Sequence, residues 1–89
     1  MIELYNNNGE IVEAVELVDT MGSILECVNF IVGTRHDYRM TDTNSGIIIK
    51  FPGLTLRADY GTYIVKDTNG GFNVVNADIF ETQFCKVVT

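Results

Sequence analysis

Apolar, β-branched residues that alternate with polar ones predict strands along most of this chain. The pattern is clearest in residues 62–66 and 72–75, which combine β-branched and aromatic side chains. Asn69 and Gly70 lie between these segments, and both residue types tolerate the positive φ angles of a tight hairpin turn. We therefore expect the two segments to pair as a hairpin, through a two-residue turn or a closely related bulged turn.

Further strands are predicted on both sides of this hairpin, at residues 10–18, 34–41, 46–51, 54–58 and 85–88. Residues 2–5 are either a short strand or a loose arm, and residues 6–9 form a turn. Segment 34–41 is the most polar of the set, which favours an edge strand or an ordered loop. In segment 10–18 the apolar residues point to both sides, which is typical of a strand covered on both faces or interrupted by a bulge.

Residues 21–32 show the three- and four-residue spacing of apolar side chains that predicts an amphipathic helix. Asp19 or Thr20 is expected to cap its N-terminus. Cys27 and Phe30 lie off the centre of the apolar stripe, so we expect them to face a neighbouring element or a second chain. The residues of the stripe, which we expect in the core, are Met21, Ile24, Leu25, Val28, Ile31 and Val32.

A second, shorter helix is predicted at residues 77–84. Asn76 precedes it, and an asparagine side chain can accept a hydrogen bond from a backbone N–H of the first turn. Ile79, Phe80 and Phe84 are expected to hold this helix against the sheet.

Together these elements predict an α+β fold: a compact, bent antiparallel β-sheet, partly barrel-like, with one main helix and a short C-terminal helix. The 89 residues suffice for one modest core, so we expect a single domain over residues 1–89. Apolar residues make up 46% and charged residues 20%, which is typical of a globular rather than a disordered chain.

Charge is distributed unevenly along the chain, since the first 34 residues contain six acidic residues and no Lys or Arg. The formal net charge of −6 argues against a nucleic-acid polymer as partner, because such binding needs a broad basic face. A small anionic ligand needs only a few well-placed donors and is not excluded. Such a ligand would depend on the basic residues of the second part of the chain, which are Arg35, Arg39, Lys50, Arg57, Lys66 and Lys86.

The sequence contains no recognisable catalytic or metal-binding pattern. With one His and two distant Cys residues, a zinc or iron site lacks nitrogen and sulfur ligands. His36 and Asp37 are adjacent, so on a strand they would point to opposite faces and could not act together. We therefore expect no enzyme activity, no metal and no cofactor.

The two cysteines, Cys27 and Cys85, favour reduced thiols in a cytosolic protein over a disulfide. No apolar run approaches the ~20 residues that a membrane-spanning helix needs. The N-terminus lacks the basic region and apolar core of a signal peptide. We expect neither secretion nor a membrane partner.

Several segments of the chain share a pattern of residues and spacing with known proteins, namely Val12–Leu17, Gly46–Lys50, Thr62–Lys66, Gly71–Val74, Asp78–Glu81 and Phe84. Through these segments, residues 12–84 resemble a large family of small phage and prophage proteins. The chain departs from the family pattern at residues 58–62 and at Asn76-Ala77. The family mostly has no assigned activity, so the resemblance implies an origin, namely an accessory protein made early in the host bacterial cytoplasm.

Two functions compete on this basis. The first is a non-catalytic counter-defence protein that sequesters a small nucleotide-derived host signal, such as a cyclic dinucleotide, with basic groups on the phosphates and rings on the bases. The second is a protein-interaction module that masks a host protein through the acidic N-terminal part. A phage structural or assembly role is a third, weaker hypothesis.

For the first hypothesis the predicted ligand-binding residues are Arg35, Tyr38, Arg39, Lys50, Arg57 and Tyr60, with Tyr60 as a stacking platform. The alternative is that the arginines only balance neighbouring acidic residues at the surface, where such pairs contribute ~0–1 kcal/mol. A chain of this length offers little concave volume. We therefore expect a pocket between subunits, and hence a symmetric homo-oligomer, most simply a dimer.

Overall fold

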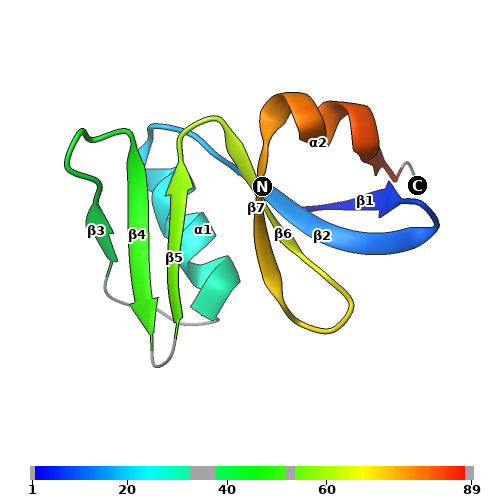
Figure 1. Cartoon of the computed structure of the whole chain (residues 1–89), viewed down its shortest axis with the longest axis horizontal. Coiled ribbons are helices and arrows are strands. Elements are labelled where there is room, and N and C mark those ends of the chain that lie inside the picture. Colours follow the sequence, from blue (N-terminus) through cyan, green and yellow to red (C-terminus); the bar gives the residue numbers. More distant parts are fainter. Residues whose placement is uncertain (1, 33–37, 52–53, 88–89) are drawn as a thin grey trace.

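A computed structural model of the chain describes residues 2–32, 38–51 and 54–87, which contain eight strands and two helices (Figure 1). In chain order these are β1 (Glu3–Asn7), β2 (Glu10–Leu17), α1 (Met21–Val32), β3 (Tyr38–Met40), β4 (Gly46–Phe51), β5 (Leu54–Asp59), β6 (Thr62–Lys66), β7 (Phe72–Asn76), α2 (Ala77–Gln83) and β8 (Cys85–Lys86). The predicted α+β fold, with antiparallel strands, a main helix and a short C-terminal helix, is confirmed.

The strands are divided between two sheets. A five-stranded sheet has the order β7-β6-β2-β1-β8, and a three-stranded sheet has the order β3-β4-β5. The chain returns from the three-stranded to the five-stranded sheet at Tyr60 and Gly61, where Gly61 has a φ of 86° and its N–H donates to the carbonyl of Leu17 over 2.8 Å. This sharp turn ends the pairing of β5 and starts that of β6, so the described strands form two sheets and no closed barrel.

Strand β2 is covered on both faces. Val15 and Leu17 belong to the larger core, which α1 and the three-stranded sheet complete. Val12 and Ala14 point the other way, into a second core with Phe80 of α2. The register of β2 with β1 and with β6 is continuous, so the alternative prediction of a bulge in this strand is wrong.

Helix α1 spans the predicted residues, and Thr20 rather than Asp19 caps it through a hydrogen bond from the Ser23 N–H to Thr20 Oγ1 (3.2 Å). The side chains in the larger core are Ile24, Cys27, Val28 and Ile31, which have the i, i+3, i+4, i+7 spacing of one helix face. The expectation that Met21 and Leu25 lie in the core is wrong, since they are 61% and 39% exposed. The small Cys27 occupies the centre of the buried face instead.

The two cysteines differ in exposure, and this difference predicts their reactivity. Cys27 is fully buried, and this burial raises the pKa of its thiol to about 11. Cys85 is exposed. We expect a disulfide-forming thiol reagent at pH 8 to modify one thiol per folded chain, because the thiolate is the reacting species, and the second only after denaturation. In the folded variant Cys85→Ser, no thiol should react with the reagent. Two thiols reacting at similar rates would contradict the placement of Cys27.

The hairpin between β6 and β7 closes through the bulged form of the predicted turn. The Gly70 N–H donates to the Asp67 carbonyl (3.1 Å) and the Asp67 N–H to the Gly71 carbonyl (2.9 Å). Gly70 has a φ of 85°, while Asn69 keeps a negative φ. The two-residue turn in which both positions have positive φ occurs between β1 and β2 instead, at residues 8–9.

The variant Gly70→Val should therefore lower the free energy of unfolding by about 1 kcal/mol or more, because a β-branched residue is strained at positive φ. Asn69→Ala in the same turn is the control, with an expected change within about 0.5 kcal/mol since this exposed position has ordinary backbone geometry. Urea denaturation measures both. Equal midpoints for Gly70→Val and the parent would show that the strained position lies elsewhere.

Helix α2 begins as predicted, with Asn76 Oδ1 accepting a hydrogen bond from the Asp78 N–H (2.9 Å). Phe80 is 2% exposed and stacks on Phe84, with ring centroids 4.5 Å apart. Ile79 was expected to join them, which is wrong, because it is 50% exposed. One position along a helix turns the side chain by about 100°, and this is enough to direct Ile79 away from the sheet.

Candidate functional site

In the part of the chain that the structure describes, the three-stranded sheet has one buried face and one face that neither a helix nor another sheet covers. Helix α1 lies on one face of this sheet (Figure 1). Ile47, Ile49 and Ala58 belong, with residues of α1, to the larger core. Side chains on a strand alternate between faces, so the intervening residues point outward. Three of them are basic and come from three strands, namely Arg39 of β3, Lys50 of β4 and Arg57 of β5. Ile48 of β4 lies on the same face, between the two arginines. We call these four residues the basic face.

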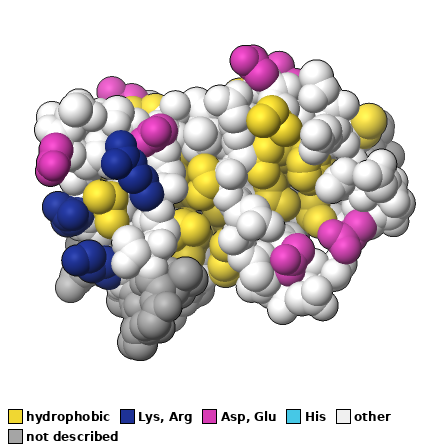
Figure 2. Space-filling view, in the orientation of Figure 1, with side chains coloured by type: hydrophobic (Ala, Val, Ile, Leu, Met, Phe, Trp, Pro, Cys, Tyr) yellow, Lys and Arg dark blue, Asp and Glu magenta, His cyan; other side chains and the backbone are white. Residues whose placement is uncertain are grey.

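The strand register explains how the basic face is assembled. Ile48 pairs with Arg39 on one side and with Arg57 on the other, so the three residues form one row across the sheet. Lys50 follows two positions along β4 and is paired with Thr55. With strands ~4.8 Å apart and ~3.3 Å per residue, the Cα atoms of Arg39 and Arg57 are ~10 Å apart, and that of Lys50 is ~8 Å from each. Figure 2 shows Lys and Arg side chains gathered over this sheet with hydrophobic surface among them.

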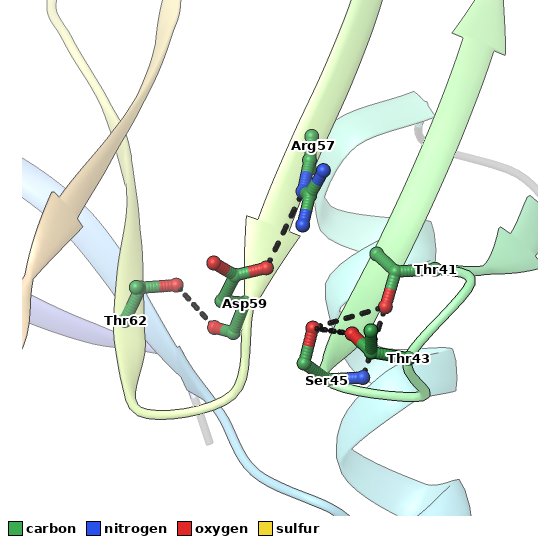
Figure 3. A network of polar contacts seen from close by, with 6 residues as sticks. All are labelled: Thr41, Thr43, Ser45, Arg57, Asp59 and Thr62. Carbon is green, nitrogen blue, oxygen red and sulfur yellow. Dashed lines mark hydrogen bonds and ion pairs between the residues drawn. The ribbon is translucent and has the colours of Figure 1, made fainter.

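The β3–β4 connection holds Arg39 in this register through side-chain hydroxyls (Figure 3). Thr41 Oγ1 accepts a hydrogen bond from the Ser45 N–H (2.9 Å) and lies 3.1 Å from Ser45 Oγ. The Thr43 hydroxyl donates to Ser45 Oγ over 2.8 Å. Thr41 is 3% exposed, so this network is partly withdrawn from water and ties the end of β3 to the start of β4.

Gly46 holds β4 and β5 together at the same end of the sheet. It pairs with Asp59, and a Cβ atom at position 46 would lie 2.1 Å from the carbonyl oxygen of Ala58. Only a residue without a side chain permits this approach of the two backbones. The approach sets the register that places Arg57 beside Ile48.

Arg57 is paired within the basic face. Its Nε lies 3.4 Å from Asp59 Oδ1, and the two side chains are 60% and 53% exposed (Figure 3). The backbone carbonyl of Asp59 accepts a hydrogen bond from the Thr62 hydroxyl (2.6 Å), which holds this residue in place. An exposed pair of this kind contributes ~0–1 kcal/mol, so an incoming phosphate can compete with Asp59 for the guanidinium.

The two predicted tyrosines do not join the basic face. Tyr38 and Tyr60 pack against the larger core, and the Tyr38 hydroxyl donates to Met21 Sδ over 3.5 Å. The Tyr60 hydroxyl is buried without a hydrogen-bond partner in the part of the chain described. Burial, together with the nearby Asp19 carboxylate, raises the pKa of Tyr60. Neither ring is therefore placed to stack on a ligand bound to the basic face.

Of the six predicted ligand-binding residues, the structure brings together Arg39, Lys50 and Arg57. Arg35 lies outside the described residues. Ile48 was not predicted, although its signal was present, because it alternates with the core residues Ile47 and Ile49 and shares its side of the strand with Lys50.

A second feature is a hollow of about 320 Å³ lined by carboxylates and phenol rings. Its location was not predicted, although an acidic surface in the first part of the chain was. The hollow lies where β1, β2 and β6 meet the start of α1, and its lining residues are Glu3, Tyr5, Glu16, Val18, Ser23, Glu26 and Tyr63. We call this the acidic hollow.

The acidic hollow is built by the turn from β2 into α1. Ser23 Oγ accepts a hydrogen bond from the Val18 N–H (2.9 Å) and donates to the Glu16 carbonyl (3.2 Å), which draws α1 against the end of β2. Burial is the main cause that raises the pKa of Tyr63, followed by the Glu16 carboxylate. Lys86 of β8 forms an ion pair with Glu3 at the rim, and this hydrogen bond raises the pKa of Lys86.

Within residues 2–32, 38–51 and 54–87, no cluster of His, Cys, Asp and Glu side chains has an arrangement able to hold a metal ion. In the same residues neither helix has the length and apolar character that crossing a membrane requires.

Comparisons with models of protein families, with curated proteins and with solved structures each found no match. The resemblance to phage proteins stays a prediction.

Proposed function

We propose that this protein binds and sequesters a small anionic nucleotide, such as a cyclic dinucleotide, on the basic face without transforming it. The observation that carries the proposal is the register of the three-stranded sheet, which gathers Arg39, Lys50 and Arg57 around Ile48 on one open face. These cations come from three different strands, so their convergence is a property of the fold and not of a local run of basic residues.

The chemistry of the four residues suits a nucleotide. A guanidinium donates two parallel hydrogen bonds to a phosphate, while an ammonium serves as a compact positive charge. Ile48 is half-buried between the arginines and offers an apolar surface for a base or ribose, in the place where a tyrosine ring was expected. The net charge of −6 disfavours a long polyanion that would extend beyond the basic face.

The biological context of the proposal comes from the resemblance to small phage proteins. On that hypothesis the protein acts in the host cytoplasm as a counter-defence protein, and the ligand is a nucleotide messenger of host immunity. Sequestration needs only tight binding, so the absence of a catalytic pattern in the sequence is compatible with it.

Calorimetry on the purified chain tests the proposal with cyclic di-AMP, cyclic di-GMP and cyclic GMP-AMP as titrants. The variants Arg39→Glu, Lys50→Glu and Arg57→Glu should each weaken binding about tenfold or more, because a charge-assisted hydrogen bond contributes ~1.5–3 kcal/mol. Lys66→Glu is the matched control, since it makes the same charge change on β6 of the other sheet, and it should bind as the parent does. Circular dichroism checks that each variant folds.

The proposal is overturned if the parent binds none of the three ligands, or if all three variants on the basic face bind as the parent does.

The acidic hollow favours a second candidate function, the masking of a host protein through a basic side chain of that partner. Glu16 and Glu26 lie in the hollow beside the ring of Tyr63, a combination that attracts Lys or Arg. If this candidate holds, one host protein should be recovered in pull-downs with the parent and lost with Glu16→Lys and Glu26→Lys. The variant Arg57→Glu should still recover it, whereas recovery that is insensitive to the hollow variants would exclude this surface.

A further inference from the structure

Two exposed turns that each contain an Asn-Gly pair lie at the same end of the five-stranded sheet. Residues 8–9 join β1 to β2, and residues 69–70 lie in the turn that joins β6 to β7. Because β2 pairs antiparallel with β6, the two turns are neighbours. The Thr68 hydroxyl of the second turn donates to Glu10 Oε2, beside the first turn, over 3.3 Å.

An asparagine that is followed by glycine can lose ammonia. The backbone nitrogen of the glycine attacks the side-chain amide carbon, and the new bond closes a five-membered succinimide ring. The amide nitrogen leaves as ammonia with the proton of the attacking N–H. Water then opens one of the two ring carbonyls, which gives aspartate or isoaspartate. Glycine has no side chain, so it does not hinder this close approach.

We propose that Asn8 is a deamidation site in the folded protein, and that Asp67 protects Asn69 from the same reaction. Both asparagines are exposed, so water reaches either site. The two sites differ in the nucleophile, which is the backbone nitrogen of the glycine that follows.

The nitrogen of Gly70 is held in its turn by Asp67. The Gly70 N–H donates to the Asp67 carbonyl over 3.1 Å. On either side of it, the N–H groups of Asn69 and Gly71 both donate to the Asp67 carboxylate, each over 2.9 Å. Attack on Asn69 must therefore break a backbone hydrogen bond and turn peptide groups that the carboxylate binds. The negative charge of Asp67 also opposes deprotonation of the Gly70 nitrogen.

The nitrogen of Gly9 is held by a side chain instead. Its N–H donates to Asn6 Oδ1 over 2.9 Å, in an exposed hydrogen bond. This acceptor is neutral, and it can rotate away while Asn7 and Glu10, on either side of the turn, stay paired. Glu10 is the next residue along the chain, but its carboxylate accepts the hydrogen bond from Thr68 of the other turn. The reaction at Asn8 therefore needs movement only within the two-residue turn.

Deamidation at Asn8 changes both the charge and the backbone. Either product adds one negative charge to a chain whose formal net charge is −6. Isoaspartate also adds one carbon to the main chain of a turn in which Asn8 and Gly9 have φ angles of 55° and 90°. A two-residue hairpin turn has a narrowly defined geometry, so this product should weaken the pairing of β1 with β2.

Peptide mapping by mass spectrometry tests the proposal on the parent chain after incubation in mildly alkaline buffer. We expect Asn8 in the folded chain to deamidate about fivefold faster than Asn69 or more, because the additional hydrogen bonds of the second turn must open first. In urea the two sites should react at similar rates, which measures the reactivity of each pair without the fold. Fragment ions distinguish aspartate from isoaspartate.

Two variants separate the roles of the two acceptors. Asp67→Ala should raise the rate at Asn69 severalfold and leave the rate at Asn8 unchanged. Asn6→Ala should raise the rate at Asn8 and leave that at Asn69 unchanged. Circular dichroism checks that each variant folds, and the comparison within the parent chain depends on neither.

Equal rates at the two sites of the folded parent, or a faster reaction at Asn69, would overturn the proposal. So would an Asn8 that stays intact in the folded chain over a period in which the unfolded chain reacts. A rate at Asn69 that Asp67→Ala leaves unchanged would overturn the protective role of Asp67.

Discussion

Replacing Gly46 by alanine should lower the free energy of unfolding by about 3 kcal/mol, at the upper end of what overpacking costs. The added Cβ would lie 2.1 Å from the Ala58 carbonyl oxygen and 2.6 Å from the Asp59 Cα atom. Both are backbone atoms, so no side-chain rotation relieves the contact. Strands β4 and β5 must separate at this end, which also removes the register that aligns Ile48 with Arg57.

Gly22→Ala is the matched control for this variant. Gly22 lies in the first turn of α1, and a Cβ there meets nothing within 4 Å. Alanine is the better helix former by ~1 kcal/mol, so this variant should be neutral or more stable than the parent. Urea denaturation of both variants measures the contrast, and a loss of less than about 1 kcal/mol for Gly46→Ala would contradict the close approach of the two strands.

Replacing Phe80 by alanine should have a comparably large effect, with an expected loss of about 3–5 kcal/mol. Its ring stacks on that of Tyr63 with centroids 3.8 Å apart and planes 4° from parallel, and it meets Tyr5 edge-on at 4.7 Å. Phe80 is also one of four buried residues of the second core, so its removal leaves a cavity that the remaining three are too small to fill.

Ile79→Ala is the control for α2, since it shortens a neighbouring side chain that is 50% exposed, and it should cost less than about 1 kcal/mol. Thermal unfolding separates the two variants. Similar losses for both would mean that α2 is rotated about its axis relative to the arrangement described.

Local pattern was sufficient to predict most of the elements. The bounds of α1 and β4 are those expected from apolar spacing and turn residues, and Asn76 caps α2 as predicted. These features depend on interactions within a few residues. The rotation of α1 about its axis is not set by such local interactions. Whether Leu25 or Cys27 is a core residue depends on what the helix packs against.

The pairing of strands that are distant along the chain could not be predicted from the sequence. β2 pairs with β6 and β1 with β8, and neither pairing leaves a local signal. The division into two sheets depends on the backbone turn at Tyr60 and Gly61, whose residues are equally compatible with one bent sheet.

The candidate site was predictable in part. Asymmetry of charge along the chain pointed to the second part for cationic groups, and three of these do lie on one face. Tyr38 could join Arg39 in one site only if this segment were a loop. Residues 38–40 form strand β3 instead, and alternation along a strand puts Tyr38 and Arg39 on opposite sides.

The most direct test of the central claim is a nuclear magnetic resonance titration of the labelled parent chain with cyclic di-AMP, cyclic di-GMP and cyclic GMP-AMP. The account predicts that at least one of them shifts the backbone amides of Arg39, Ile48 and Arg57 most strongly. The Arg57 Nε–H signal should shift as well, because that group exchanges Asp59 for a phosphate. The signals of the backbone amides of Glu16 and Glu26 should not shift. Shifts centred on the acidic hollow, or none with any of the three ligands, would contradict the assignment of the basic face as the binding surface.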